Sequence, residues 1–147
     1  MKELFLAVTA KLKTITALRW IDEDYGQADN YQLRPAIEFP AALVTVNYDS
    51  TEDTGEAIDM EQHVRASVQV RLVFETTGET NTYAPDTVRQ QALARFDIVD
   101  QVHEYLQSFD NLGKMAGLTR TSMQSEPRRD GYKVVAIRYV TDFTEAY

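Results

Sequence analysis

The sequence of 147 residues contains no cysteine, and this absence excludes three kinds of chemistry. The chain can form no disulfide, has no thiolate nucleophile and offers no cysteine ligand for zinc. A chain without cysteine also fits a reducing compartment. There are only two histidines, His63 and His103, and they lie far apart in the sequence. Metal sites need clustered ligands, so we interpret both histidines as structural or surface residues and expect no metal site.

Positive charge and long apolar runs are scarce as well. The chain has 23 acidic and 15 basic residues, a net charge of −8, which disfavours binding to nucleic acid or acidic membranes. Near the N-terminus, Glu3, Lys11 and Lys13 leave an apolar run too short for a secretory signal. No run approaches the roughly 20 apolar residues that span a bilayer. We expect a cytosolic chain with no membrane partner and no sequence-specific nucleic-acid partner.

Motifs of catalysis are also missing. The sequence has no glycine-rich pattern that cradles phosphates, and its serines lack the context of a nucleophile elbow. Its acidic stretches match neither a calcium-binding loop nor the paired carboxylates and lysine of a nuclease. We therefore predict no enzyme activity and no cofactor. A small metal-dependent enzyme that uses the acidic loops stays open as an alternative.

Apolar residues recur every three or four positions in residues 2–18 and 85–109, which predicts two amphipathic helices. Pro85 stands where the first turn of a helix tolerates proline, and Gly113 follows the second stretch as a plausible stop. The apolar stripe of the second helix is predicted to comprise Val88, Ala92, Phe96, Val99, Val102, Leu106 and Phe109.

Alternation of apolar and polar residues predicts the strands. The longest stretch is EQHVRASVQVRLVFE, residues 61–75, in which every second residue is apolar. A register slip of one residue would move this whole set into water, so the facing of the strand is well determined. Further strands are predicted at residues 19–22, 41–48, 118–125 and 132–143. The last one is apolar on both faces, which favours a central position in the sheet.

Residues 1–147 therefore read as a single domain of the α+β class, in the order α-β-β-β-α-β-β. Two layers are expected: a mostly antiparallel sheet of four or five strands, and two helices packed on one of its faces. Trp20 is expected to cap the core beneath the first helix. Long acidic loops are predicted at residues 22–34, 49–62 and 76–84, where they look more suited to docking than to catalysis.

The order of elements resembles that of the tail-terminator and neck (head–tail joining) proteins of tailed bacteriophages. The similar parts are the N-terminal helix and short strand, RPAIEFPAALVTV, HVRASVQVRLVFE, one long helix, and YKVVAIRYVTDFTEAY. The resemblance implies a structural virion protein without an active site, assembled in the cytoplasm of a bacterial host. It also implies a ring of copies, often six, that stops growth of the tail tube and meets the connector. The implied partners are the chain itself, tail tube proteins and connector proteins.

Ring formation would give the polar face of the long strand a partner. We predict that Arg65 and Arg71 meet carboxylates of a neighbouring copy, that Gln69 belongs to the same subunit interface, and that salt or Arg71→Glu weakens assembly. The expected carboxylates are Asp49, Glu52 and Asp53. Arg128 and Arg129 are interpreted as residues that keep a loop tip soluble or contact an acidic neighbour. The alternative without a ring is a monomeric adaptor that binds a peptide along a sheet edge.

Overall fold

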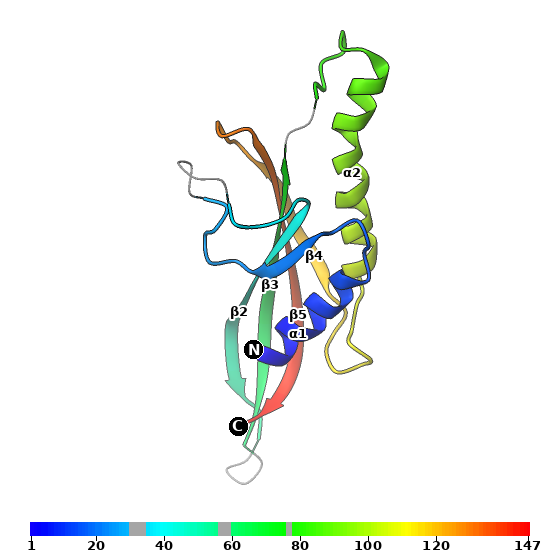
Figure 1. The fold of residues 1–147 in the computed structure, drawn as a ribbon. Helices are drawn as coiled ribbons and strands as arrows, with labels where there is room; N and C mark the ends of the chain where they lie inside the picture. The colour runs from blue at the N-terminus through cyan, green and yellow to red at the C-terminus, as the bar shows by residue number, and fades with distance from the viewer. Residues whose placement is uncertain (30–34, 56–59, 76–77) are drawn as a thin grey trace.

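The computed structural model describes residues 1–29, 35–55, 60–75 and 78–147, and it has two helices beside one five-stranded sheet (Figure 1). The order α-β-β-β-α-β-β and the α+β class agree with the prediction. Parts of the predicted loops, at residues 30–34, 56–59 and 76–77, lie outside the described residues. The elements are α1 Lys2–Lys13, β1 Trp20–Glu23, β2 Ala41–Asp53, β3 Glu61–Glu75, α2 Asp86–Leu106, β4 Thr119–Glu126 and β5 Tyr132–Ala146.

The strands follow the order β1-β2-β3-β5-β4 across the sheet. β1 pairs with β2 in parallel, and every other neighbouring pair is antiparallel. β3 lies in the middle and pairs with β5 along its whole length, from Glu61 to Glu75. β5 therefore has a partner on each side, which confirms its predicted central position. β1 and β4 are the edge strands.

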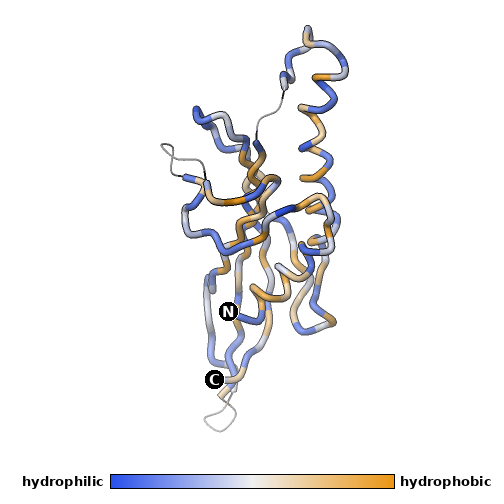
Figure 2. Tube along the Cα trace, in the orientation of Figure 1, coloured by the Kyte–Doolittle hydropathy of each residue, from blue (hydrophilic) through white to orange (hydrophobic). Residues whose placement is uncertain are grey.

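The main core lies between the sheet and the helices. As predicted, the alternate apolar residues of β3 all point to this side, and the apolar stripe of α1 covers them. Burial of each such side chain stabilises the fold by roughly 1.5–3 kcal/mol before ordering costs. Figure 2 shows hydrophobic positions along the middle of the sheet and on both helices. From β3, the buried members are Val64, Ala66, Val68, Val70, Leu72 and Phe74.

Both helices are shorter than predicted. α1 ends at Lys13, yet Ile15 and Leu18 beyond it are still buried, because the following turns keep them over the core. α2 begins at Asp86 and ends at Leu106, and its N-terminal half extends beyond the sheet (Figure 1). Phe96 was placed on the buried stripe, and this prediction is wrong: its side chain is 45% exposed. It borders a hollow beside the ends of β4 and β5, which leaves part of the ring in contact with water.

β2 is longer than predicted and takes up the start of the expected loop at residues 49–62. It continues to Asp53 with a bulge between Tyr48 and Ser50, because β3 offers hydrogen-bonding partners along this whole stretch. Glu52 and Asp53 are therefore strand residues. The distal parts of β2, β3 and β5 form an extension beyond α1, visible at the lower end of the sheet in Figure 1.

The sheet face opposite the helices, which was expected to meet a neighbouring copy, is partly covered by the chain itself. Residues 24–29 and 35–40 lie on this face and contribute to a second, smaller apolar cluster there. Trp20 packs against this cluster and not beneath α1, so its predicted place was wrong. The rings of Phe39 and Tyr132 stack at its border, with centroids 5.2 Å apart. The buried members are Ala28, Ile37, Ala41, Leu43, Val73 and Val134.

Candidate functional site

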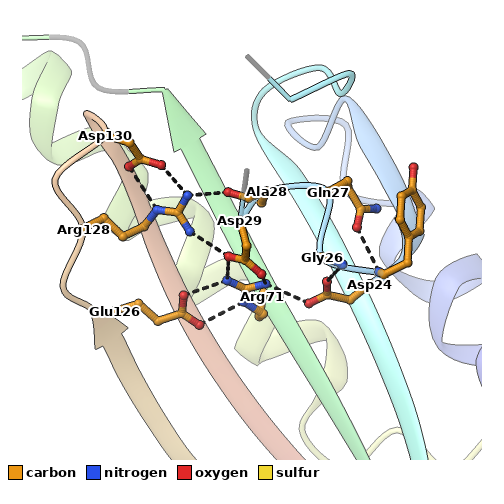
Figure 3. A network of polar contacts seen from close by, with 10 residues as sticks. Asp24, Gly26, Gln27, Ala28, Asp29, Arg71, Glu126, Arg128 and Asp130 are labelled. Atoms are coloured by element: carbon orange, nitrogen blue, oxygen red, sulfur yellow. Dashed lines mark hydrogen bonds and ion pairs between the residues drawn. The ribbon is translucent and has the colours of Figure 1, made fainter. Parts of the chain in front are cut away.

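Arg71 is a buried cation on the face opposite the helices, and its five N–H groups all bind carboxylates of its own chain (Figure 3). Nε and Nη2 donate to the two oxygens of Glu126, at 2.9 and 2.8 Å. Nη1 donates to Asp24 at 3.1 Å, and Nη1 and Nη2 donate to Asp29 at 3.0 and 2.8 Å. The residue is only 8% exposed. A guanidinium has five donors, so none is left for another molecule.

The expected contact of Arg71 with a neighbouring copy therefore has to be corrected. Alternation along β3 points its side chain to the second face, where its cross-strand neighbours are Leu43 and Ala136. Apolar neighbours on both sides leave a charge without water, and a buried charge needs partners. No local signal separates Arg71 from Arg65, which stands in the same alternating stretch and is exposed.

Arg128 was also assigned to the surface, and the structure places it inside. Its side chain is 2% exposed. Nη1 donates to Asp29 at 3.0 Å, Nε donates to Asp130 at 3.1 Å, and Nη2 donates to the carbonyl oxygen of Ala28. Arg129, the next residue, is exposed. Of the two arginines, Arg129 therefore fits the role of keeping a loop tip soluble and Arg128 does not.

Asp29 accepts hydrogen bonds from both arginines and so joins them into one network. We call this set the arginine network: Asp24, Asp29, Arg71, Glu126, Arg128 and Asp130. It ties the segment after β1, the middle of β3, the end of β4 and the β4–β5 turn to one another (Figure 3). A local turn holds Asp24 in place, because its other oxygen accepts the N–H of Gly26, whose φ of +86° suits glycine.

The network lowers the pKa of two of its carboxyl groups. Hydrogen bonds from Arg71, helped by its charge and by Arg128, hold the pKa of Asp29 below its ordinary value of 3.8, although burial acts in the opposite direction. The hydrogen bond from Arg128 likewise lowers the pKa of Asp130. The three carboxylates around Arg71 in turn raise its pKa, so it stays protonated. These pKa shifts favour the ionised carboxylates paired with the arginines. The arginine network therefore stabilises the fold by holding its segments together.

We expect the protein to lose stability in acid through this network. Because the folded-state pKa of Asp29 and Asp130 is depressed, their contribution is fully present above about pH 3.8 and is lost as the pH falls through the folded values. Urea unfolding at a series of pH values should give a falling free energy below about pH 4. Asp29→Asn should flatten this slope, whereas Asp97→Asn on α2 should keep it. Parallel curves for wild type and Asp29→Asn would contradict the assignment.

The other half of this face, toward the distal ends of the strands, is polar and open. Asp49 lies at the bulge of β2 and accepts a hydrogen bond from Ser67 at 2.9 Å. Its other oxygen pairs with Arg138 of β5 at 2.7 Å. Gln69 lies between these strands and is half-buried. Arg65 is exposed further along β3 and has no ion-pair partner among the described residues. Thus Asp49 is engaged within the chain, while Arg65 remains available.

The two remaining predicted interface acids lie at the end of β2. Glu52 and Asp53 are both exposed. Asp53 accepts hydrogen bonds from Gln62 at 2.9 Å and from Tyr147 at 3.2 Å, both neutral donors. In the part of the chain that the structure describes, neither carboxylate pairs with a lysine or arginine. Their assignment to a subunit interface stays a prediction.

Besides the outer edge of the four-residue β1, two longer stretches of sheet edge lack a strand partner in the described structure. β4 is an edge strand in which every residue except Glu126 is exposed, and only β5 pairs with it. On the other side, β1 pairs only with the first four residues of β2, up to Val44. Residues 45–53 of β2 therefore have an open outer edge as well. Such edges expose backbone N–H and C=O groups that can pair with another strand.

The described residues give no support to the metal-dependent enzyme. They contain no group of three histidine, cysteine, aspartate or glutamate residues that could hold a metal ion. A hollow of about 660 Å³ lies between α2 and the end of β3, and its described lining includes Phe74, Glu79, Arg95 and Lys133 but neither histidine nor serine. No helix in the described ranges is both long and apolar enough to cross a bilayer.

The comparisons with known proteins give likeness at the level of the fold. No protein-family model matches the chain, and no curated protein matches it. Among solved structures, it is similar to a chain in the structure titled "Virion of native gene transfer agent (GTA) particle". The TM-score is 0.52 at 12% sequence identity, and the match covers 97% of this chain and 95% of the other. At this identity the match establishes a common fold along nearly the whole chain.

Proposed function

We propose that this chain is a structural subunit of a phage-like particle and acts by assembly, not by catalysis. The observation that carries the proposal is the match, nearly end to end, with a chain of a gene transfer agent virion. The proposal gains support from the two open sheet edges and from the polar half-face, which suit contacts between proteins.

The finer role that we propose is that of a tail terminator or head–tail joining subunit. Copies form a closed ring, six being the number that the family resemblance implies, and the ring docks between tail tube and connector proteins. The protein thus acts as a virion component that is assembled in the bacterial cytoplasm. A ring requires a heterologous contact, in which two different surfaces of the chain meet. The distal edge of β2 and the edge of β4 are two such surfaces on opposite sides of one sheet.

The test is the assembly state of the purified full chain. Sedimentation velocity over a wide range of concentrations should show a discrete oligomer, and negative-stain electron microscopy should show closed rings. Raising the salt concentration should shift the oligomer toward the monomer, because exposed charges contribute to the contacts. A protein that stays monomeric at every concentration and salt level would refute the ring.

The exposed edge of β4 also supports the alternative of a monomeric adaptor domain. An exposed edge such as β4 can also accept a peptide strand from an unrelated protein, as an adaptor domain would. The two functions differ in their assembly state, because an adaptor would be a stable monomer. The same sedimentation experiment therefore separates them.

A further inference from the structure

We propose that copies of this chain join edge to edge, with β4 of one copy pairing antiparallel to residues 45–53 of β2 in the next copy. In this contact Arg120 lies against Asp53 of the neighbour. The inference rests on the proposed ring and names the two surfaces that form it. As interface residues, the exposed Arg120 and Asp53 take the place of Arg71 and Arg128, which are buried and bind carboxylates of their own chain.

The two open edges match in length. β4 has eight residues. β2 has thirteen residues, of which β1 covers the first four, so nine remain without an outer partner. An eight-residue strand therefore fits into the open part of β2 without displacing β1. Each edge also carries one bulge, between Tyr48 and Ser50 in β2 and between Arg120 and Ser122 in β4. Bulges at sheet edges hinder indiscriminate pairing, which favours a specific partner strand.

The charges of the two edges are complementary. Residues 45–53 contain three carboxylates and no lysine or arginine, and Asp49 among them is already paired with Arg138. Glu52 and Asp53 thus make this edge negative. On β4, the exposed side chain of Arg120 has no carboxylate partner among the described residues, and its Nη1 donates to the sulfur of Met123 at 3.8 Å. Its backbone N–H donates to the side-chain oxygen of Gln107 at 3.1 Å, a bond that a neighbouring strand would have to displace at this position. In a chain of net charge −8, an exposed arginine at an open edge favours an acidic strand as its occupant.

Strand directions within the sheet bring these charges together. β3 runs antiparallel to both β2 and β5, and β4 runs antiparallel to β5. β4 and β2 therefore point in opposite directions. Rotation about a ring axis keeps each strand's direction along that axis, so β4 meets β2 of the next copy antiparallel. Arg120 near the start of β4 then faces Asp53 at the end of β2, whereas a parallel pairing would separate the two residues.

The two side chains also lie on the same side of the sheet. Arg120 pairs across the ladder with Tyr139, whose side chain is in the core beneath the helices. Beyond the bulge of β2, Thr51 lies opposite the core residue Val64, and Asp53, two residues later, points to the same side. In a continuous sheet, the guanidinium and the carboxylate would therefore project from one face and could form an ion pair.

The strand register within one copy, together with the pairing of Arg120 and Asp53, determines how far the strands would tilt from the axis of a closed ring. Within one copy, the register places Arg120 level with Val46, by way of Tyr139 and Val68. Along β3, the partner of Asp53 lies six residues from the partner of Val46. This offset along the strands amounts to roughly 20 Å. Across the sheet, β2, β3, β5 and β4 of one copy span roughly 19 Å, and the ratio of the two lengths gives a strand tilt of about 45° to the ring axis. Closed barrels have strand tilts of about 35–45°, so the pairing is compatible with closure.

The test uses two charge reversals, Arg120→Asp and Asp53→Arg, in the full-length chain. Each variant alone places like charges at every contact, and we expect each to weaken self-association by about tenfold or more in sedimentation experiments. An equal mixture of the two variants should assemble again. In alternating order every contact of the mixture carries opposite charges, so rescue is expected for rings with an even number of copies and for open chains.

Control variants change the net charge equally but lie away from both edges. Lys13→Asp on α1 and Asp97→Arg on α2 both alter exposed residues and should assemble like wild type. All variants should keep the wild-type urea midpoint, because none of the altered side chains is buried.

The outcomes separate the two proposals. Normal rings from Arg120→Asp or Asp53→Arg, or a mixture that stays dissociated, would overturn the edge pairing and leave the ring function standing. A wild-type protein that never assembles would overturn both.

Discussion

Replacing Arg71 with methionine is expected to lower the free energy of unfolding by about 3–5 kcal/mol, the range for breaking a buried ion pair by removing one partner. Methionine keeps much of the side-chain length and removes all five donors. The carboxylates of Asp24, Asp29 and Glu126 would then face one another with no guanidinium between them. Most small domains have about 5–15 kcal/mol of stability, so this loss is a large fraction of the total.

Arg65→Met is the matched control for this prediction. Arg65 lies on the same strand and the same face, but it is exposed and has no ion-pair partner among the described residues. Its replacement should change the free energy of unfolding by less than about 0.5 kcal/mol. Urea unfolding followed by circular dichroism measures both variants. Similar small effects for the two would show that the arginine network does not clamp the fold.

Arg128→Ala is expected to be the second most damaging of these substitutions, at about 2–3 kcal/mol. The side chain is almost fully buried, and its loss removes the guanidinium donors of Asp130 and the carbonyl oxygen of Ala28 and one of the donors of Asp29. We set the value below that for Arg71 because Asp29 is partly exposed and retains its bonds to Arg71.

Arg129→Ala supplies the control, since it removes the same kind of side chain one residue further along. Arg129 is exposed, and its loss should change the free energy of unfolding by less than about 0.5 kcal/mol. Because Asp29 binds both buried arginines, the effects of Arg71→Met and Arg128→Ala should not be additive. A double variant whose loss equals the sum of the two would indicate that the arginines act independently.

A substitution that destabilises the fold cannot test a contact between subunits. The sequence pattern suggested Arg71→Glu as a test of subunit contacts. In the structure this substitution would place a fourth carboxylate beside Asp24, Asp29 and Glu126, so it would disturb the fold first. Loss of assembly in that variant would say nothing about the interface. Arg120→Asp alters an exposed residue and avoids this problem.

Local patterns in the sequence predicted the elements and their facing. The alternation in residues 61–75 determined which side of β3 meets the helices, because a strand repeats every two residues and burial penalises the opposite register. The stripe of α1 was found in the same way. Phe96 was misplaced because periodicity identifies one side of a helix but does not say how far the sheet extends beneath it.

Some of the predicted interface residues are buried and others are exposed, and the local sequence does not distinguish the two groups. Arg65 and Arg71 share a residue type, a strand and a face, and Arg128 and Arg129 are neighbours, yet in each pair one is buried and the other exposed. The open edges of β2 and β4 likewise depend on how far β1 reaches along β2.

The sequence by itself determined the α+β class, the order of the elements and the apolar side of the sheet, because these follow from short-range periodicity and burial. Only the tertiary structure decided which charges serve the fold and which remain for a partner. The physical reason is that the carboxylates at positions 24, 29 and 126 meet Arg71, and that at position 29 meets Arg128, through chain folding over long sequence separations. No spacing along the chain encodes such contacts.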